Sequence, residues 1–480
     1  MNFKRDLLIL VSFFALINLY EAQTKTSIIG GNWNNPFIWS PFGVPSSTDN
    51  VLIASNHQVN LTSDQACNSL TVGNGGNAYL RFDSGTNRTF TVNGNIVVAT
   101  NARFRVAGAN GNHTVTLAGD IINNGTINFY RNNNRNAELV LVKNGNQSIS
   151  GSGIESRFYN IRLNMGSSFN NIADFSTTSF IVLADFLKLQ NGTFRYSKVS
   201  AVNITPFNNA ITIPSTAGLW MNSAASIMSL PNGLIVSGKL TNSTGTMNVG
   251  NGINETLLYA GGTFSFTGGV TNVAGRFNGN TAASTCNFNM SGGSFTVPSV
   301  STNNTTEAPF QIGTAGSQFN MSGGTILIRR EGGNNAQDLG YVNLAGSGTV
   351  SGGTLQIGNA TTPGGSTFRI NSTALVPNLV LNNATATASL FTNALNVANT
   401  ILINSGTLNS NNLGITLGRS WLNQGGTFTP GTSTVTFNSN SAQTLYKLGG
   451  ETFNHLRFSG IGVKSFSSAI TSSRNFSISS

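Results

Sequence analysis

One short motif returns along this chain at a nearly constant interval. Residues 288–293 read Phe-Asn-Met-Ser-Gly-Gly, and residues 319–324 repeat the same six letters 31 positions later. A related Gly-Gly pair ends at Gly262 and another at Gly353. A fixed period of this size is typical of an array of stacked repeats. A propeller blade needs about 40–50 residues, so the spacing favours the coil of a β-helix, in which three short strands fit into about 20–30 residues.

The segments between the glycines have the pattern of strands. Apolar and polar residues alternate, as in Thr-Phe-Thr-Val at 89–92 and Thr-Val-Thr-Phe at 434–437. Glycine suits the turns because it reaches positive φ without steric cost. We therefore predict an all-β fold, a right-handed parallel β-helix (solenoid) with an N-terminal β cap. The apolar residue after each Gly-Thr should point inward and stack on its equivalent in the next coil, and Asn side chains near the turns should form hydrogen-bond ladders.

Composition agrees with a long core and excludes disorder. Charged residues make up 8% of the chain, against about 25% in ordinary globular domains. Yet 39% of the residues are hydrophobic and 31 are Phe, enough to bury a core. The net charge is +10, but the bases are scattered, with Arg103/Arg105 and Arg329/Arg330 as the densest pairs. This pattern predicts a solubility role and no nucleic-acid partner, and it leaves open a weak attraction to acidic polysaccharide.

The N-terminus has the layout of an export signal. Lys4 and Arg5 precede an apolar run over 7–20, and Ala22 provides a cleavage site. The run is shorter than the roughly 20 residues that span a bilayer. We therefore expect a signal peptide over 1–22, no transmembrane span after its removal, and a secreted or cell-surface protein. We expect 28–75 to form the N-terminal cap and first coils, and 76–480 to form continuous β-helix repeats.

Few residues carry reactive chemistry in a pattern that suggests a site. The one local concentration joins Arg329, Arg330, Glu331, Asp338 and Tyr341, which we interpret as a surface loop because loops collect charge. No two carboxylates are spaced for glycoside hydrolysis, and no His or Cys pair has metal-ligand spacing. The sequence thus predicts no catalytic, cofactor-binding or metal-binding residues and no cofactor.

Several single residues have a structural interpretation. Trp33 and Trp39 should pack the cap, although they could form a sugar-stacking pair. Cys67 and Cys286 should be buried, unpaired thiols, since distant coils lie beyond disulfide reach. None of His57, His113 and His455 is spaced as a metal-ligand pair. His113, beside a strand, and His455, at a repeat position that Asn160 holds elsewhere, are expected to be exposed.

The first mature residues carry a family resemblance. They read Gly-x-Trp at 31–33, Trp-Ser at 39–40, Gly-x-Pro at 43–45, Asp-x-Val-x-Ile at 49–53 and Cys-x-Ser-Leu-x-Val at 67–72. This string resembles the start of β-helical surface proteins that gliding and related Gram-negative bacteria export through the type IX secretion pathway. A second repeat, at 147–163 and 443–458, is similar to one found in the same proteins. The resemblance implies a right-handed parallel β-helix at the cell surface, adhesin-like in character.

One departure from that family concerns the C-terminal end. Its members end in a sorting domain, whereas residues 476–480 end inside what looks like a new strand. An open solenoid end exposes strand edges and normally needs a cap. We therefore expect the sequence to be truncated at this end.

Two functions remain open on this evidence. The first is a non-catalytic structural or adhesive β-helix, with cell-surface glycans or other surface proteins as partners. The alternative is a polysaccharide-active enzyme, a lyase or hydrolase, or a carbohydrate-binding module on the same fold. Two or more carboxylates converging with Arg or Lys in one groove would favour the enzyme.

Overall fold

The computed structural model describes residues 22–302, 306–332 and 339–479. It is 54% strand and 1% helix, arranged as a β-solenoid of about 19 turns with parallel strands, and this confirms the predicted parallel β-helix. The expected signal peptide over 1–22 lies almost entirely outside the described residues.

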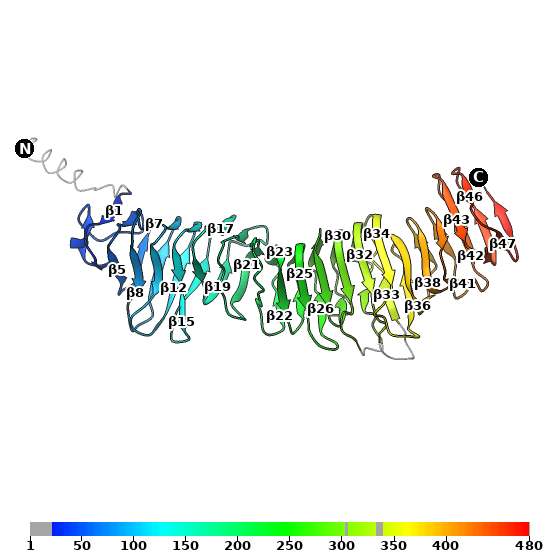
Figure 1. Cartoon of the computed structure of the whole chain (residues 1–480), viewed down its shortest axis with the longest axis horizontal. Helices are drawn as coiled ribbons and strands as arrows, with labels where there is room; N and C mark the ends of the chain where they lie inside the picture. Colours follow the sequence, from blue (N-terminus) through cyan, green and yellow to red (C-terminus); the bar gives the residue numbers. More distant parts are fainter. Residues whose placement is uncertain (1–21, 303–305, 333–338, 480) are drawn as a thin grey trace, which may run out of the picture. The chain divides into compact units, whose positions relative to one another are not determined.

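The chain forms two compact units, each a stack of coils (Figure 1). Unit 1 comprises the chain up to Lys143 together with Ser148–Ile161 and Thr177–Ile181. Unit 2 comprises Asn144–Gln147, Arg162–Ser176 and the chain from Val182 onward.

Three parallel sheets form the faces of unit 1. The first contains β4 (Asn50–Ile53), β7 (Ser69–Val72), β10 (Ile96–Val98) and β13 (Ile121–Asn123). The second contains β6 (Gln65–Cys67), β9 (Thr89–Val92), β12 (Gly111–Leu117) and β16 (Arg135–Leu141). The third contains β2 (Gly31–Asn32), β5 (Gln58–Leu61), β8 (Tyr79–Phe82), β11 (Arg103–Val106), β14 (Thr126–Asn128) and β18 (Glu155–Arg157). Every second residue faces inward, so in-register neighbours such as Leu80 and Phe104 stack in the core.

The first coil is closed by an antiparallel element. Strand β1 (Thr24–Ser27) pairs antiparallel with β3 (Trp39–Ser40) and parallel with β4, and a 3-10 turn at Pro36–Ile38 precedes β3. Trp33 and Trp39 are buried, with ring centroids 5.0 Å apart, and the Trp39 Nε1–H donates to the Trp33 carbonyl at 2.8 Å. The expectation that both tryptophans pack the cap is confirmed.

Unit 2 contains long strands: β23 (Ala217–Leu230), β25 (Lys239–Val249), β30 (Asn287–Val297), β32 (Gln318–Ile328), β34 (Val350–Ile357), β36 (Asn378–Leu390) and β38 (Ile401–Asn409). Of these, β30, β32 and β34 contain a glycine pair, at which the strand bends. Short strands form another face: β22 (Ile211–Ile213), β24 (Leu234–Val236), β26 (Thr256–Tyr259), β29 (Arg276–Gly279), β31 (Phe310–Ile312), β33 (Leu339–Asn343) and β35 (Thr367–Ser372). The later coils include β40 (Trp421–Asn423), β43 (Gln443–Lys447), β45 (His455–Phe458) and β48 (Phe476–Ile478).

The two glycines of each pair are required for different reasons, one for its backbone conformation and one for the close approach of the neighbouring coil. The second glycine takes a positive φ, +72° at Gly293 and +78° at Gly324, a conformation that favours glycine. The first lies against the preceding coil, since a Cβ at Gly323 would be 2.3 Å from the Ser291 carbonyl oxygen. The predicted glycine turns are thus confirmed.

The inward apolar residues follow two columns at these bends. Phe264, Phe288 and Phe319 align in one, and Phe295, Ile326 and Leu355 align in another. The expected stacking of each residue after Gly-Thr is therefore right from Phe295 to Leu355. It is wrong for Phe264, whose partner is Phe288, and the partner that follows Leu355 is Leu379. The reason is coil length, because 24 positions separate Phe264 from Phe288 but 31 separate Phe288 from Phe319.

Both columns nonetheless belong to one core. The Phe277 ring lies between them, with centroids 5.1 Å from Phe264 and 5.6 Å from Phe295. All three side chains are fully buried. Packed aromatic rings at these distances stabilise beyond the area that they bury, so the coils share a continuous apolar interior.

Candidate glycan-binding groove

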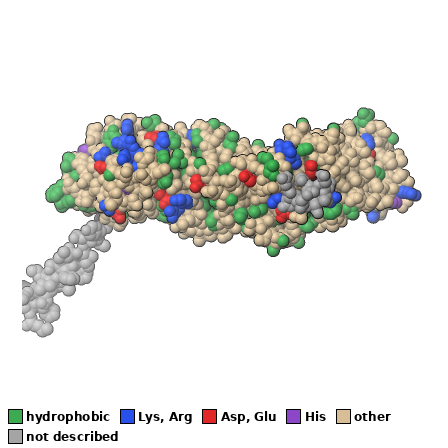
Figure 2. All heavy atoms as spheres, turned by 90° about the horizontal axis from the view of Figure 1, so that it is seen from below, with side chains coloured by type: hydrophobic (Ala, Val, Ile, Leu, Met, Phe, Trp, Pro, Cys, Tyr) green, Lys and Arg blue, Asp and Glu red, His purple; other side chains and the backbone are tan. Residues whose placement is uncertain are grey.

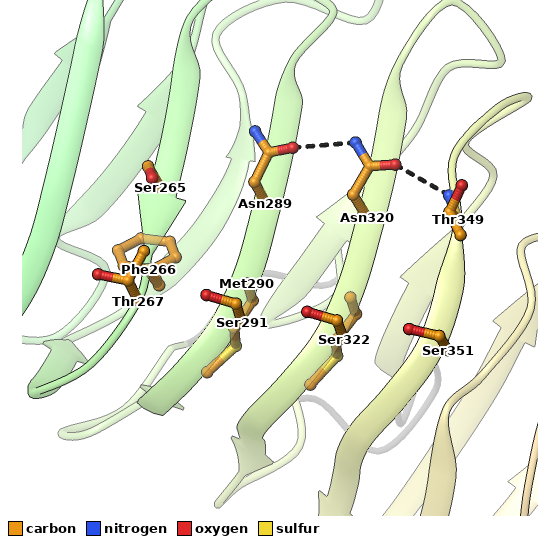
Figure 3. Close-up of a pocket in the computed structure, with 11 residues that line it drawn as sticks. Ser265, Phe266, Thr267, Asn289, Met290, Ser291, Asn320, Ser322, Thr349 and Ser351 are labelled. Carbon is orange, nitrogen blue, oxygen red and sulfur yellow. Dashed lines mark hydrogen bonds between the residues drawn. The ribbon is translucent and has the colours of Figure 1, made fainter.

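A shallow groove of about 360 Å³ runs across neighbouring coils of unit 2 (Figure 3). It lies over β27 (Thr263–Phe266), β30, β32 and the start of β34. The groove is lined by side chains with hydroxyl, amide or apolar groups: Ser265, Phe266, Thr267, Asn289, Met290, Ser291, Asn320, Met321, Ser322, Thr349 and Ser351. The groove is therefore uncharged and combines polar side chains with an apolar surface.

One side of the groove is a hydrogen-bond ladder between coils. The Asn320 Nδ2–H donates to Asn289 Oδ1 at 2.9 Å, and the Thr349 backbone N–H donates to Asn320 Oδ1 at 2.9 Å (Figure 3). Asn289 Nδ2 donates in turn to the Phe264 carbonyl at 3.1 Å. This confirms the predicted Asn ladder, and it fixes the amide side chains in one orientation.

The other side is a row of hydroxyl groups. Ser291, Ser322 and Ser351 each follow one of three residues that align across successive strands, Met290, Met321 and Val350. Figure 3 shows the three serine side chains in a line with the oxygens pointing the same way. All three residues are exposed, and their hydroxyls form no hydrogen bond within the described parts of the chain. Neighbouring strands lie about 4.8 Å apart. The row therefore offers free donors and acceptors at regular intervals.

The floor of the groove is apolar. Phe266, Met290 and Met321 are each 1–2% exposed. Hydroxyl and amide groups beside an apolar floor suit a neutral sugar, which presents hydroxyl groups at its edge and C–H groups on its face. The lining contains no ionisable side chain, so it offers no group for general acid or base catalysis.

The charged cluster that the sequence suggested around Arg329 and Tyr341 is not brought together in the fold. Tyr341 lies in the core on β33, stacked on Phe310 at 5.2 Å, and not on a surface loop. Burial raises the pKa of its hydroxyl above the ordinary value, although the hydrogen bond from Asn343 opposes this. Arg329 donates to two backbone carbonyls of the preceding coil, those of Pro298 and Val300. Arg330 and Glu331 stay next to it in the chain, and Asp338 lies outside the described residues.

His113 is not exposed as expected. It is 2% exposed and stacks on Phe82, with ring centroids 4.4 Å apart. Burial, aided by the positive charge of Arg88, lowers the pKa of His113 to about 4. Its Nδ1 accepts the Arg88 backbone N–H at 3.2 Å, so the neutral ring is the form that the core holds. His455 is half-buried.

The two thiols are placed as expected. Cys67 and Cys286 are buried and free. Burial raises the pKa of both, that of Cys286 to about 12. Over the described part of the chain, no group of three or more His, Cys, Asp or Glu side chains could hold a metal ion.

The structure also gathers residues that the sequence separates. Arg81 and Arg105 are direct neighbours on β8 and β11, and Arg103 lies in register with Tyr79. In the sequence we interpreted the basic residues as scattered and so missed this cluster. We also interpreted the Ser before each glycine pair only as part of a turn. The sequence did contain a signal for each feature. Alternation in Tyr-Leu-Arg-Phe (79–82) and Arg-Phe-Arg-Val (103–106) places the arginines on the outer face, and the repeat containing Ser291 and Ser322 places the serines at equal intervals.

Comparisons of the chain with models of protein families, with curated protein sequences and with solved structures gave no match. The class that the coordinates define is a parallel β-solenoid. Among the residues described, no helix has the length and apolar character needed to cross a membrane.

Proposed function

We propose that this protein is a non-catalytic, adhesive or structural β-helix of the cell surface or the secreted fraction, and that its groove binds neutral glycans. The observation that carries the proposal is the uncharged groove with its regular row of free hydroxyls beside an ordered amide ladder. Such a surface offers hydrogen bonds at several adjacent coils, and an extended sugar chain can use them together. Surface glycans are therefore the preferred partners.

Binding to neutral polysaccharides tests this directly. The chain from Gln23 onward is titrated against soluble xylan, β-glucan, mannan and dextran by calorimetry, and we expect saturable binding to at least one of them. The variant Ser291→Gln/Ser322→Gln fills the groove with two long side chains, so affinity should fall by roughly tenfold or more, about 1.4 kcal/mol.

The matched control is Asn251→Gln/Asn280→Gln. Both positions are exposed and lie outside the groove lining of the same unit, so this variant should bind as the parent does. Absence of binding to every polysaccharide, or equal loss in both variants, would contradict a glycan site in the groove.

The catalytic alternative has its own test. Each polysaccharide is incubated with the chain, and new reducing ends and unsaturated products are measured. We expect neither to increase above a heat-denatured control. Steady turnover that survives repurification would favour the lyase or hydrolase and overturn the non-catalytic proposal.

Export is tested with the first residues alone. Residues 1–30 are fused to a reporter enzyme in a Gram-negative host, beside a fusion in which Lys4 and Arg5 are replaced by Glu. We expect export of the first fusion, with the mature N-terminus at Gln23, and retention of the second. A reporter that stays in the cytoplasm with its leader intact would contradict a secreted location.

A further inference from the structure

The third sheet of unit 1 carries a cluster of arginines on its outer face. Arg81 on β8 and Arg105 on β11 are paired in register, and Arg103 is paired with Tyr79. Arg131 lies on β15 (Tyr130–Asn132), a short strand that contacts β11. Figure 2 shows Lys and Arg side chains gathered over the N-terminal coils. Residues from three different coils thus form one basic patch.

The positive charge of this patch is incompletely balanced. Arg81 pairs with Asp83 at 2.8 Å. Arg103 and Arg131 are exposed and have no carboxylate partner within the described residues, and the buried Nε of Arg105 has no hydrogen-bond acceptor there. Among the described residues, Asp83 is the one carboxylate that forms an ion pair with these four arginines.

The positive charges of neighbouring arginines also affect the pKa of Arg105. Burial lowers the pKa of the Arg105 guanidinium below its ordinary value, and three neighbouring charges lower it further: Arg103, Arg131 and Arg81. Like charges held this close repel each other. An anion placed among the exposed guanidinium groups would remove this cost.

The surroundings of the patch indicate which kind of anion it suits. The guanidinium groups of Arg103 and Arg105 each lie 5.6 Å from the centre of the Tyr79 ring. The ring is therefore engaged in cation–π contacts and is poorly placed to stack a nucleobase. Asn60 and Asn128 continue the Arg81–Arg105 row on either side. A pair of charged groups with an amide group on either side fits an anion that carries hydroxyl groups beside its charges.

We propose that this patch binds an anionic polysaccharide, one that carries carboxylate or sulfate groups, through Arg103, Arg105 and Arg131. The inference deepens the adhesive function proposed above and rests on it. Failure of the arginine patch to bind can be told apart from failure of the neutral groove to bind. The groove belongs to unit 2 and is tested with its own variants and its own polysaccharides.

The experiment uses the chain from Gln23 onward and three anionic probes: polygalacturonate, dextran sulfate and a single-stranded poly-dT oligonucleotide. Uncharged dextran is the reference for dextran sulfate. We expect saturable binding to at least one of the two anionic polysaccharides. The affinity should fall as NaCl is raised, because salt screens the arginine charges.

The variant Arg103→Gln/Arg131→Gln removes two exposed charges and leaves the half-buried Arg105 in place. We expect the affinity for the polysaccharide to fall roughly three- to tenfold, the loss of two exposed charge contacts. Arg419→Gln/Arg474→Gln removes the same net charge at exposed positions of unit 2 and should change binding by less than about twofold. Equal losses in the two variants would show attraction to net charge alone and would overturn the site.

The relative strength of the probes decides the ligand. Stronger binding of polygalacturonate assigns a carboxylated glycan, and stronger binding of dextran sulfate assigns a sulfated one. Tighter binding of poly-dT than of both polysaccharides, lost in Arg103→Gln/Arg131→Gln, would overturn the inference in favour of a nucleic-acid site.

Discussion

At the scale of single residues, burial decides the chemistry of the two cysteines. Cys67 and Cys286 are 0% and 4% exposed, and burial raises the pKa of both thiols. Only the thiolate reacts readily with electrophiles. A Cys in this state behaves as a small apolar side chain, which is the role expected from the sequence.

We therefore predict that neither thiol reacts in the folded protein. Incubation with iodoacetamide at neutral pH should leave the intact mass unchanged, whereas the same treatment in denaturant should add two carbamidomethyl groups. Rapid labelling of Cys67 without denaturant would show that the coil around it opens readily.

His113 makes folding sensitive to acid. Its pKa is about 4 in the folded protein and about 6.5 in an unfolded chain. Above pH 6.5 the ring is neutral in both states and has no effect. As the pH falls from about 6.5 to about 4 the unfolded chain takes up a proton that the folded chain does not, so stability is lost over this range, by at most about 3 kcal/mol.

Urea unfolding at pH 7 and pH 4.5 tests this prediction. The parent should lose more stability between the two pH values than His113→Gln, whose side chain does not titrate. Asn280→Gln, at an exposed position, serves as the control and should keep the pH dependence of the parent. An equal pH dependence in the parent and in His113→Gln would contradict the assignment.

At the scale of elements, the glycine pairs determine how closely coils approach. A methyl group at Gly323 would lie 2.3 Å from the Ser291 carbonyl oxygen, and backbone cannot easily move there because the strands on both sides are paired. Gly313 differs, since its Cβ would meet nothing nearer than 3.7 Å.

We predict that Gly323→Ala destabilises the protein by about 1–3 kcal/mol, the usual cost of overpacking. Gly313→Ala should be neutral or stabilising by up to about 1 kcal/mol, because alanine restricts the unfolded chain without strain. Urea midpoints of the two variants and the parent measure the difference. Equal stability of the two variants would show that the close approach at Gly323 relaxes at little cost.

At the scale of the whole molecule, packing of buried apolar side chains contributes more to stability than ion pairs do. Most ion pairs of the described residues are at partly exposed positions, as in Arg157–Glu155 at 2.8 Å and Arg195–Asp174 at 2.7 Å, whereas Lys447–Glu451 has a buried carboxylate. Partly exposed pairs contribute about 0–1 kcal/mol each. By contrast, buried Phe, Leu, Ile and Val side chains line the interior of the coils from β4 to β45.

Stability should accordingly depend little on ionic strength. Raising NaCl from about 0.01 M to about 0.5 M screens exposed pairs and also the repulsion from the net charge of +10, and the two effects oppose each other. We expect the free energy of unfolding to change by less than about 1 kcal/mol. A loss of several kcal/mol in high salt would show that ion pairs are a main source of stability.

The sequence by itself determined the class of fold and the local features. Alternation in segments such as 89–92 specifies a strand through neighbouring residues alone, and Gly293 specifies a turn because a positive φ favours glycine. These are short-range constraints, readable one segment at a time. The same is true of the repeated Phe-Asn-Met-Ser-Gly-Gly, whose regular spacing predicted stacked coils.

Only the tertiary structure decided which residues meet across coils. Coil length varies, so alignment depends on how each loop is accommodated, and this separates Phe264 from Phe295 while bringing Arg81 beside Arg105. Burial is equally non-local, and it placed His113 against Phe82 inside the core. Both candidate binding surfaces are rows running across strands, and a row of that kind exists only once the register between coils is set.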